Sequence, residues 1–331
     1  MTPGTDTHAY RWRMGRRSSS RRSAGTQRPT GRTRRAGPRA LPEGDVVVST
    51  GTVRLQREPG TDQVTVYLNG VPSSSLDLAD PTWLEFEYMQ QMAAVVAALP
   101  PGPLDVLHLG AAACALPRWL DAVRPGSRQL AVDVDAELVR LVREWFPLPR
   151  APRLRLRVQD ARAAVAAMPD ASLDVVVRDV FDGTSTPAEL TTSEFVADVV
   201  RVLRPGGVYL ANCADRPPLA LAKAEVATLR RLMSEVALVA EPGVLRGRRY
   251  GNVVLAAVPV RESGPGLDGA GLARALRSLP VPTRLLHGGE LAEFAAGTPV
   301  LRDRPVLHEP PREAVPPGDD EGRAVVARPP S

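Results

Sequence analysis

The chain has 331 residues, 42 basic and 37 acidic side chains, and a formal net charge of +5 at pH 7. That length suits one large domain with appendages or two modest domains. No apolar run approaches the roughly 18 residues that a membrane helix needs. The two cysteines are too few for a disulfide framework or a metal site. We therefore expect a soluble, cytoplasmic protein with reduced cysteines, no membrane contact and no metal.

The positive charge is concentrated at the N-terminus. Residues 1–40 contain eleven arginines and one acid, Asp6, whereas the rest of the chain carries 31 basic and 36 acidic groups. Because this tail is rich in Arg, Ser, Gly and Thr and lacks apolar periodicity, residues 1–44 are predicted to be disordered. Clustered arginine suits a contact with nucleic acid. A non-functional extension is the alternative that we favour.

Residues 45–81 are predicted to form a small antiparallel β unit. Three runs rich in β-branched residues lie at 46–48, 52–55 and 63–68. The second and third runs alternate apolar and polar side chains, as a half-buried strand does. Pro59-Gly60 between them is a turn signal, and Asn69-Gly70 turns the chain after the third.

Residues 82–260 are predicted to form a doubly wound α/β domain. A helix is expected at about 82–99, followed by alternating strands and helices. Strands are expected at 104–109, 129–134, 153–158, 173–178 and 207–212. Two further runs, near 236–240 and 252–258, are joined by an Arg- and Gly-containing loop, which predicts an antiparallel hairpin. Five βα units followed by a hairpin indicate an open sheet of seven strands.

The C-terminal part is predicted to lie outside this sheet. Residues 261–303 are expected to form a helical extension with one or two helices. Residues 304–331 are rich in proline and acids, which is typical of a disordered tail.

The first strand of the sheet leads into a small-residue loop, Gly110-Ala-Ala-Ala-Cys-Ala115, and the next strand ends at Asp133, 23 residues after Gly110. Strand, tight turn, helix, strand and acid is the order of a nucleotide-binding unit, in which backbone N–H groups approach the ligand and the acid takes a ribose diol. A full Gly-x-Gly-x-x-Gly motif would need glycines where Ala112 and Ala115 stand. A nucleoside site and a structural turn are therefore both open.

Polar residues also follow the later strands, where an open α/β sheet binds its ligand. Asp160 either caps the next helix or accepts a hydrogen bond from an exocyclic amino group of the ligand. Asp133 is assigned to the ribose, because Asp135 is better placed as a helix cap. Asp179 follows an apolar run and is a candidate general base for an amine, with a loop-capping aspartate as the alternative. Asp182 lies three residues further on and can face the same cavity.

Two further residues have reactive side chains. His108 lies in the middle of a predicted strand and is interpreted as a packed core histidine. Cys114 lies at the start of a predicted helix, where the helix dipole is expected to lower its thiol pKa. No histidine and acid partner it in the sequence, so nucleophilic catalysis by this cysteine is not expected.

Several motifs occur together along residues 50–260. They are Asn69-Gly70, Tyr88, Val106-Leu-His-Leu-Gly110, Asp133, Asp160, Leu173-Asp-Val-Val-Val-Arg-Asp179-x-x-Asp182 and Arg204-Pro-Gly-Gly207. In this combination the chain resembles the spermidine synthase family of aminopropyltransferases. The resemblance implies a Rossmann-like, seven-stranded methyltransferase fold, the class I S-adenosylmethionine-dependent type.

The resemblance also implies residue roles. Asp133 would hold the ribose and Asp160 the adenine amino group, while Asp179 would deprotonate the attacking amine and Asp182 help to bind it, beside the pocket tyrosine Tyr88. The co-substrate is implied to be decarboxylated S-adenosylmethionine or S-adenosylmethionine, without a metal, and the partner a small-molecule amine. A homodimer remains open. The implied cofactor-binding set is Gly110, Ala111, Ala113, Asp133, Val134, Gln159, Asp160 and Ala161.

The chain departs from the family pattern in its loops. The family loop Gly-Gly-Gly-Asp-Gly-Gly is replaced, so that Ala113 stands at the acid that contacts the transferred aminopropyl group. Met89 replaces the glutamine after the pocket tyrosine, and Gly183 replaces the proline after the second aspartate. Arg246-Gly-Arg-Arg-Tyr-Gly251 replaces the Tyr-Pro-rich amine segment. Nucleoside binding therefore transfers from the family more directly than polyamine recognition.

These residues predict a transferase that moves an aminopropyl group to an amine, with Asp179 as general base. Methyl transfer from S-adenosylmethionine is the first alternative. An acid in the loop would repel the carboxylate of this co-substrate, and position 113 carries alanine instead of the family's acid. A catalytically silent nucleoside-binding protein is the second alternative.

Overall fold

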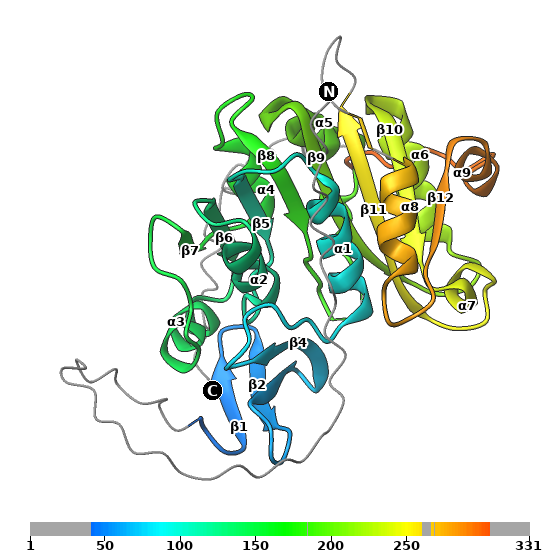
Figure 1. Cartoon of the computed structure of the whole chain (residues 1–331). Coiled ribbons are helices and arrows are strands. Elements are labelled where there is room, and N and C mark those ends of the chain that lie inside the picture. Colours follow the sequence, from blue (N-terminus) through cyan, green and yellow to red (C-terminus); the bar gives the residue numbers. More distant parts are fainter. Residues whose placement is uncertain (1–40, 184, 260–265, 268, 305–331) are drawn as a thin grey trace, which may run out of the picture.

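The computed structural model describes residues 41–183, 185–259, 266–267 and 269–304. They form a small antiparallel sheet beside a larger α/β body (Figure 1). The two segments predicted as disordered tails, including the Arg-rich one, lie almost entirely outside the described residues. Among the described residues, no helix is both long and apolar enough to span a membrane.

The N-terminal sheet is a four-stranded antiparallel meander. Its strands are β1 (Asp45–Val48), β2 (Gly51–Arg57), β3 (Gln63–Leu68) and β4 (Val71–Asp77). The first three match the predicted runs, whereas β4 was not predicted. Pro72 and three consecutive serines give this segment little strand character on its own. The Asn69-Gly70 turn folds it onto β3, where Ser74 and Ser75 become buried.

The main sheet has eight strands in the order β12-β10-β11-β9-β8-β5-β6-β7. They are β5 (Asp105–Leu109), β6 (Arg128–Asp133), β7 (Leu154–Val158), β8 (Leu173–Arg178), β9 (Leu203–Asp215), β10 (Met233–Ala240), β11 (Gly251–Pro259) and β12 (Arg284–His287). Strands β5 to β9 pair in parallel, and β10 and β11 form the predicted antiparallel hairpin. The predicted seven-stranded sheet is therefore confirmed, with one strand added.

The added strand corrects the expectation of a purely helical extension at 261–303. β12 pairs antiparallel with Ala237–Ala240 at the edge of the sheet. An open edge strand presents unpaired N–H and C=O groups, so a short strand from the C-terminal segment gains backbone hydrogen bonds there. Its four residues alone carry too little pattern to be recognised as a strand.

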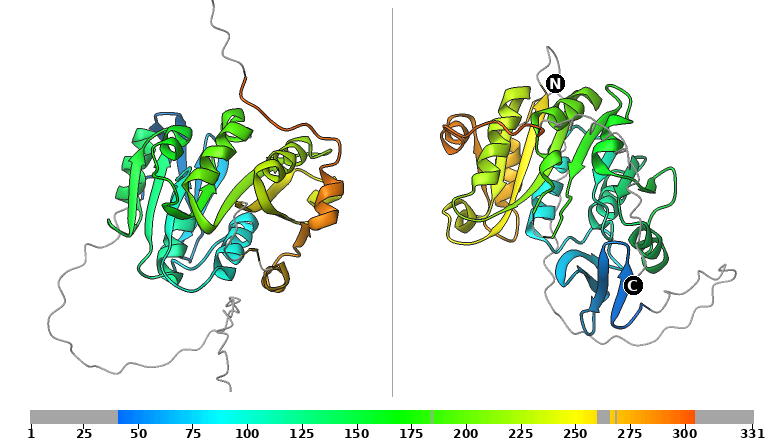
Figure 2. Two further views of the ribbon diagram at one scale, coloured as in Figure 1. Left: turned by 90° about the horizontal axis from the view of Figure 1, so that it is seen from above. Right: turned by 180° about the vertical axis from the view of Figure 1, so that it is seen from behind.

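Helices cover both faces of the sheet (Figure 2). Apolar side chains of α1, α2, α3 and α8 belong to one core cluster, and those of α4, α5, α6 and α9 to the other. This is the doubly wound arrangement predicted from the alternating elements. The helices are α1 (Glu87–Ala98), α2 (Ala115–Val123), α3 (Ala136–Trp145), α4 (Ala161–Ala166), α5 (Ser193–Val202), α6 (Ala220–Leu232), α7 (Pro242–Leu245), α8 (Gly269–Arg277) and α9 (Gly288–Phe294), with a 3-10 turn η1 (Ala188–Leu190).

The first helix begins later than predicted. The expected start was Thr82, but α1 begins at Glu87. The Asp80 carboxylate accepts hydrogen bonds from the N–H and hydroxyl groups of Thr82, at 2.8 and 2.6 Å, and so holds this stretch in a turn. An aspartate that bonds the backbone two residues on competes with helix formation in this way.

The central strands are buried on both faces. In β8, Val175 and Val177 pack into one cluster and Val176 into the other. A parallel strand covered by helices on both sides needs such a continuous apolar run. The run Val175 to Val177 ends at Arg178 and Asp179, which places polar groups at the carboxyl end of the strand.

The N-terminal sheet is attached to the main body through Asp135. This carboxylate accepts hydrogen bonds from the N–H groups of Ser49 and Thr50, at 3.0 and 2.7 Å, and from the Thr50 hydroxyl at 2.7 Å. It also caps α3 through the N–H of Leu138 at 2.8 Å, as the sequence predicted. The β1–β2 turn is therefore bonded next to the end of β6.

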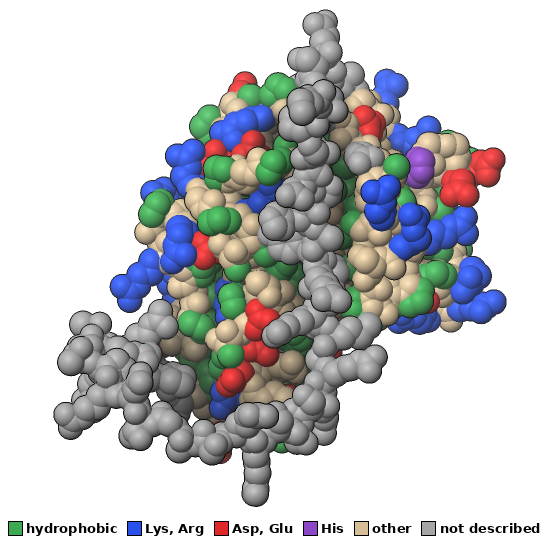
Figure 3. Space-filling model, in the orientation of Figure 1, with side chains coloured by type: hydrophobic (Ala, Val, Ile, Leu, Met, Phe, Trp, Pro, Cys, Tyr) green, Lys and Arg blue, Asp and Glu red, His purple; other side chains and the backbone are tan. Residues whose placement is uncertain are grey.

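Charged side chains are mixed on the surface. In Figure 3, Lys and Arg side chains are spread over both flanks of the visible face, with acidic side chains between them. The nucleic-acid alternative concerned the Arg-rich tail, which lies outside the described residues.

Candidate functional site

Four strand ends meet at one edge of the main sheet. Leu109 of β5 is paired in register with Val132 of β6 and with Arg178 of β8, and Arg178 is paired with Ala211 of β9. The residues that follow are therefore level with one another: Gly110, Asp133, Asp179 and Asn212. Ligands of open α/β sheets bind at such an edge.

Asp179 is held by side chains from two other elements. Its Oδ2 accepts a hydrogen bond from the Tyr88 hydroxyl of α1 at 3.0 Å, and its Oδ1 accepts one from Nδ2 of Asn212 in β9 at 2.9 Å. Burial raises the pKa of Asp179 above its usual value, although both hydrogen bonds and the nearby Arg178 charge oppose the shift. The side chain is therefore positioned and is a stronger base than an exposed aspartate.

Tyr88 is neutral in this arrangement. Burial raises its pKa well above the usual value of a tyrosine, and the Asp179 charge raises it further. A protonated phenol donates its hydrogen bond to the carboxylate. The structure thus brings two of the three predicted catalytic residues into direct contact.

The third predicted catalytic residue, Asp182, is exposed. Its backbone N–H and C=O exchange hydrogen bonds with Ser185 at 2.8 and 3.1 Å, which forms a tight loop after Asp179. Among the described residues, no side chain donates a hydrogen bond to its carboxylate. Its assignment to amine binding remains a prediction.

A buried ion pair supports the end of β8 that precedes Asp179. Arg178 is fully buried and contacts Glu225 of α6 at 2.8 Å. Its Nη groups also donate to the carbonyl oxygens of Leu190 and Asn212, each at 3.0 Å. Because Asn212 donates in turn to Asp179, the arginine helps to position the asparagine that holds this carboxylate. This arginine was not predicted from the sequence to support the site. An arginine at the end of an apolar run was the signal available.

The loop after β5 has the backbone of a glycine loop with few glycines. Gly110 has φ +84°, and a Cβ there would lie 2.1 Å from the Asp179 carbonyl oxygen, so only glycine fits. Ala112 and Cys114 also adopt positive φ, at 37° and 59°. Each such non-glycine residue costs about 1–2 kcal/mol. The loop therefore keeps a strained shape that its alanines do not favour, and strain of this kind is typical of functional loops.

Asp133 lies at the carboxyl end of β6 and is half-buried. Its Oδ2 accepts hydrogen bonds from the N–H groups of Ala111 and Ala112, at 3.1 and 3.4 Å, and its Oδ1 accepts one from the N–H of Asp135 at 3.0 Å. The predicted acid and the predicted loop are thus adjacent. A ribose diol would meet a carboxylate already oriented by the backbone.

The remaining predicted cofactor residues lie near the ends of β6 and β7. Asp160 caps α4 through the N–H of Ala163 at 2.8 Å, so the capping alternative is realised in this structure. The N–H of Gln159 donates to the Asp133 carbonyl oxygen at 2.9 Å. Val134 is 58% exposed, an unusual position for a large apolar side chain beside polar strand ends. Ala161 is buried in α4.

Ala113 and Cys114 are turned away from solvent. Both are fully buried in the core cluster that contains α2. Burial raises the pKa of the Cys114 thiol to about 12, which corrects the expectation that the helix dipole lowers it. The dipole of a nine-residue helix does not outweigh the loss of solvent around the thiolate.

The core assignment of His108 is confirmed. Its Nε2 lies 2.9 Å from Oε1 of Gln129, and both residues are buried. Burial lowers the pKa of His108 to about 4, so the ring is neutral near pH 7.

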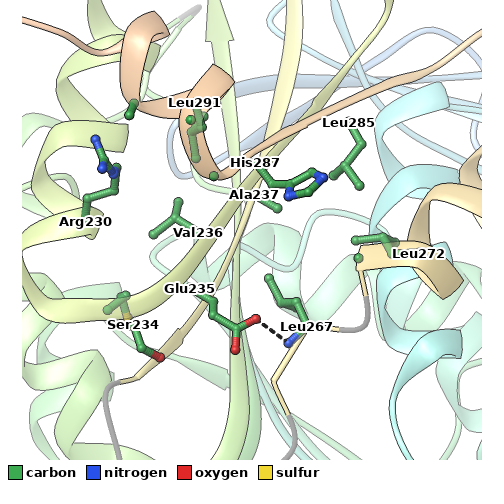
Figure 4. Close-up of a pocket in the computed structure, with 15 residues that line it drawn as sticks. Arg230, Ser234, Glu235, Val236, Ala237, Leu267, Leu272, Leu285, His287 and Leu291 are labelled. Carbon is green, nitrogen blue, oxygen red and sulfur yellow. Dashed lines mark hydrogen bonds between the residues drawn. The ribbon is translucent and has the colours of Figure 1, made fainter.

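Two of the cavities among the described residues bear on the location of the site. A cavity of about 60 Å³ opens beside Tyr88 and is also lined by Glu87, Gln91, Glu241, Val244, Arg249, Gly251 and Asn252. A larger cavity of about 520 Å³ lies at the opposite end of the sheet, where β10 and β12 meet α6, α8 and α9 (Figure 4). None of the predicted site residues lines the larger cavity. Of the predicted site residues, only Tyr88 lines the smaller cavity.

The strand order and this polar edge place the protein among the doubly wound α/β folds that bind ligands at the carboxyl ends of their strands. The family model of the spermine/spermidine synthase domain matches residues 85–262, which is more than half of the chain. The chain therefore belongs to the spermine/spermidine synthase family. This confirms the family indicated by the sequence motifs.

Individual relatives agree with this assignment. A probable spermidine synthase from Corynebacterium glutamicum has a similar structure, with a TM-score of 0.76 and 37% identity over 82% of this chain and 100% of that chain. The polyamine aminopropyltransferase of Chromobacterium violaceum is 30% identical over 139 residues, 42% of this chain and 53% of the relative. Polyamine aminopropyltransferase 2 of Pseudomonas aeruginosa is 35% identical over 147 residues, 40% of this chain and 41% of the relative. The chain thus spans about half the length of the curated relatives it matches.

Proposed function

We propose that the protein transfers an aminopropyl group from decarboxylated S-adenosylmethionine to an amine, with Asp179 as the general base. The observation that carries the proposal is the Asp179 carboxylate, held by Tyr88 and Asn212 at the strand ends beside the Gly110 loop. Membership of a family whose relatives are named polyamine aminopropyltransferases supports the reaction class.

The nucleoside end of the site suits the co-substrate. Asp133 offers a carboxylate for a ribose diol, and the backbone N–H of Ala111 in the Gly110 loop lies beside that carboxylate. Val134 offers an exposed apolar surface on which the adenine ring of the co-substrate can pack, with Gln159 and Asp160 nearby for polar contacts. A ligand amino group can use an oxygen of Asp160 alongside the helix cap, because a carboxylate accepts several hydrogen bonds.

The amine end of the site suits proton removal. An alkylamine has a pKa of about 10, so it must lose a proton before it can attack carbon. The amine nitrogen forms a bond to the propyl carbon next to sulfur, the carbon–sulfur bond breaks, and its electron pair leaves on the neutral thioether. The proton released by the nitrogen passes to Asp179. Alignment of nitrogen and leaving sulfur supplies much of the acceleration.

Replacement of the base tests the proposal. Asp179→Asn is expected to lower turnover by about 10²–10⁴-fold, the range for a lost general base. The affinity for methylthioadenosine, measured by calorimetry, should stay within about threefold, because Asp133 and the loop are unchanged. Asp170→Asn, at a mostly exposed aspartate, is the matched control. Undiminished release of methylthioadenosine by the Asp179 variant would remove the general-base role.

Methyl transfer from S-adenosylmethionine is the second candidate. It is favoured by Ala113, which leaves the loop without an acid that would repel a co-substrate carboxylate. Calorimetry with S-adenosylmethionine, its decarboxylated form and methylthioadenosine separates the candidates. Preference for the decarboxylated form supports aminopropyl transfer, and preference for S-adenosylmethionine supports methyl transfer.

A further inference from the structure

The last described residues, 298–304, cross the helices on one face of the sheet and are drawn orange to red in Figure 2. We call this segment the C-terminal strap. The N–H of Leu301 donates to the Thr228 hydroxyl of α6 at 2.9 Å, and the Leu301 carbonyl oxygen accepts from the N–H of Ser193 in α5 at 2.9 Å. The strap therefore has a defined path over α6 and α5.

The strap then forms an ion pair with α4. Both oxygens of the Asp303 carboxylate accept hydrogen bonds from Arg162, Oδ1 from Nη1 at 2.8 Å and Oδ2 from Nη2. The N–H of Asp303 donates to the Glu194 carboxylate of α5 at 3.0 Å, which holds the backbone of the aspartate. The hydrogen bond from Arg162 keeps the pKa of Asp303 below its usual value, so the pair is ionised at neutral pH. Two parallel hydrogen bonds of this kind fix the geometry of the guanidinium.

The same guanidinium also bonds the turn that follows the Asp182 loop. Nη1 of Arg162 donates to the carbonyl oxygen of Glu189 in η1 at 3.1 Å. The next carbonyl oxygen, that of Leu190, accepts a hydrogen bond from the buried Arg178 at 3.0 Å. Two arginines therefore hold successive carbonyl groups of η1, one from the end of β8 and the other from α4.

This turn is the far end of the loop that carries Asp182. The loop begins at Asp179, whose carboxylate is held by two side chains, and reaches η1 at Ala188. Between these ends, the backbone of Asp182 exchanges hydrogen bonds with Ser185, which belongs to the loop itself. The position of Asp182 relative to Asp179 therefore depends on how the two ends of the loop are held.

We propose that Arg162 is a positioning residue for the amine, and that Asp303 of the C-terminal strap fixes its orientation. Loss of Asp303 would leave the guanidinium bonded to the Glu189 carbonyl oxygen with far less restriction of its rotamers. Asp182 would then less often lie where it can bind the amine. This inference rests on the proposed function, and it adds to the site a segment that lies beyond the match to the family model, residues 85–262.

Steady-state kinetics with 1,4-diaminobutane and decarboxylated S-adenosylmethionine test this role. Asp303→Ala should raise the KM for the amine about fivefold, the scale of a partly exposed ion pair, and leave kcat within about twofold, because Asp179 keeps its own partners. Arg162→Met should raise KM at least as much. The double variant should show no further rise, since Asp303 acts only through Arg162. The affinity for methylthioadenosine should not change, because the N–H of Ala163 still bonds Asp160.

Hydrogen exchange gives a readout that does not depend on the reaction. Amide groups of residues 186–191 should exchange about fivefold faster in Asp303→Ala than in the wild type, because local opening of η1 costs less free energy. Arg201→Met is the matched control. Arg201 is about as exposed as Arg162, and it bonds Asp170 and carbonyl oxygens at the carboxyl end of α4. Its loss should change neither the amine KM nor the exchange of residues 186–191.

The outcomes separate the two proposals. Unchanged exchange at residues 186–191 in Asp303→Ala would overturn the role of the C-terminal strap. Faster exchange with an unchanged amine KM would show that the pair is only structural, and would leave the proposed function intact. If the wild-type protein releases no methylthioadenosine with the diamine, the proposed function fails and the positioning of the amine fails with it, even where exchange is faster.

Discussion

The two ends of the candidate site hold their carboxylates in different ways. Asp179 accepts hydrogen bonds from the side chains of Tyr88 and Asn212, which lie far from it in the sequence. Asp133 and Asp160 accept theirs from backbone N–H groups: Asp133 from the loop after β5 and from Asp135, and Asp160 from the first turn of α4. The first end depends on side chains packed from distant helices and strands, whereas the second depends on backbone groups of the neighbouring strand's loop and of a helix cap. Substitutions should therefore affect chemistry and affinity separately.

The largest expected effect comes from the buried ion pair between Arg178 and Glu225, next to Asp179. Glu225→Gln leaves the fully buried Arg178 without its counter-charge, which should lower the free energy of unfolding by about 3–5 kcal/mol. Turnover of the folded fraction should also fall, because Asn212 loses part of its support. Urea unfolding and steady-state rates measure the two effects. The double variant Arg178→Met/Glu225→Met should recover most of the stability; no recovery would mean that the pair is not the cause.

A smaller effect is expected where the N-terminal sheet is attached. Asp135 is buried, which raises its pKa, but hydrogen bonds from Leu138, Thr50 and Ser49 outweigh burial and hold the pKa at about 2. A carboxyl group whose pKa is lowered by folding stabilises the folded protein at any pH above the group's usual pKa. This stabilisation is lost as the pH falls toward 2. Asp135→Asn should cost about 2 kcal/mol at pH 7.

The pH dependence sharpens this prediction. Urea midpoints of the wild type should fall between pH 4 and pH 2 more steeply than those of the Asp135→Asn variant. Asp62→Asn, in an exposed pair of the same sheet with Arg57, should stay within about 0.5 kcal/mol of the wild type. Parallel pH profiles for the wild type and the Asp135 variant would contradict the assignment.

The Tyr88→Phe variant removes the hydroxyl that bonds Asp179 and leaves an aromatic ring to keep that carboxylate buried. The Tyr88 hydroxyl lowers the pKa of Asp179, so its loss should move the acidic limb of the turnover profile to higher pH. At a pH below that limb, turnover should fall about tenfold, the value of one hydrogen bond to a charged group. The affinity for methylthioadenosine should not change. A uniform loss at every pH would instead indicate a structural role for the hydroxyl.

The smallest effect concerns the strained loop at the nucleoside end. Ala112→Gly relieves a positive φ of 37°, but also frees the unfolded chain, so we expect a net gain of about 0.5 kcal/mol. Ala111→Gly is the matched control, because Ala111 has no positive φ and should lose about 1 kcal/mol instead. Thermal unfolding measures both. A stability loss in both variants would show that the loop is not strained at position 112.

Much of the fold follows from the pattern of the sequence. The apolar runs at β5, β6 and β8 and the turn at Asn69-Gly70 were recognisable because strand burial and turn geometry restrict residue types locally. Strands β4 and β12 were not recognisable. They form because a neighbouring edge offers unpaired backbone groups, a condition that no local pattern contains.

The site divides in the same way. The sequence by itself determined which polar residues end the strands, and so brought Asp133, Asp179 and Asn212 to one edge, since parallel strands share their carboxyl ends. Only the tertiary structure decided what each carboxylate contacts. Tyr88 reaches Asp179, Arg178 pairs with Glu225, and Arg162 pairs with Asp303, because packing brings together helices and loops that are distant in the chain. Residue type determines the chemistry that is available, and burial and distance determine which of it is used.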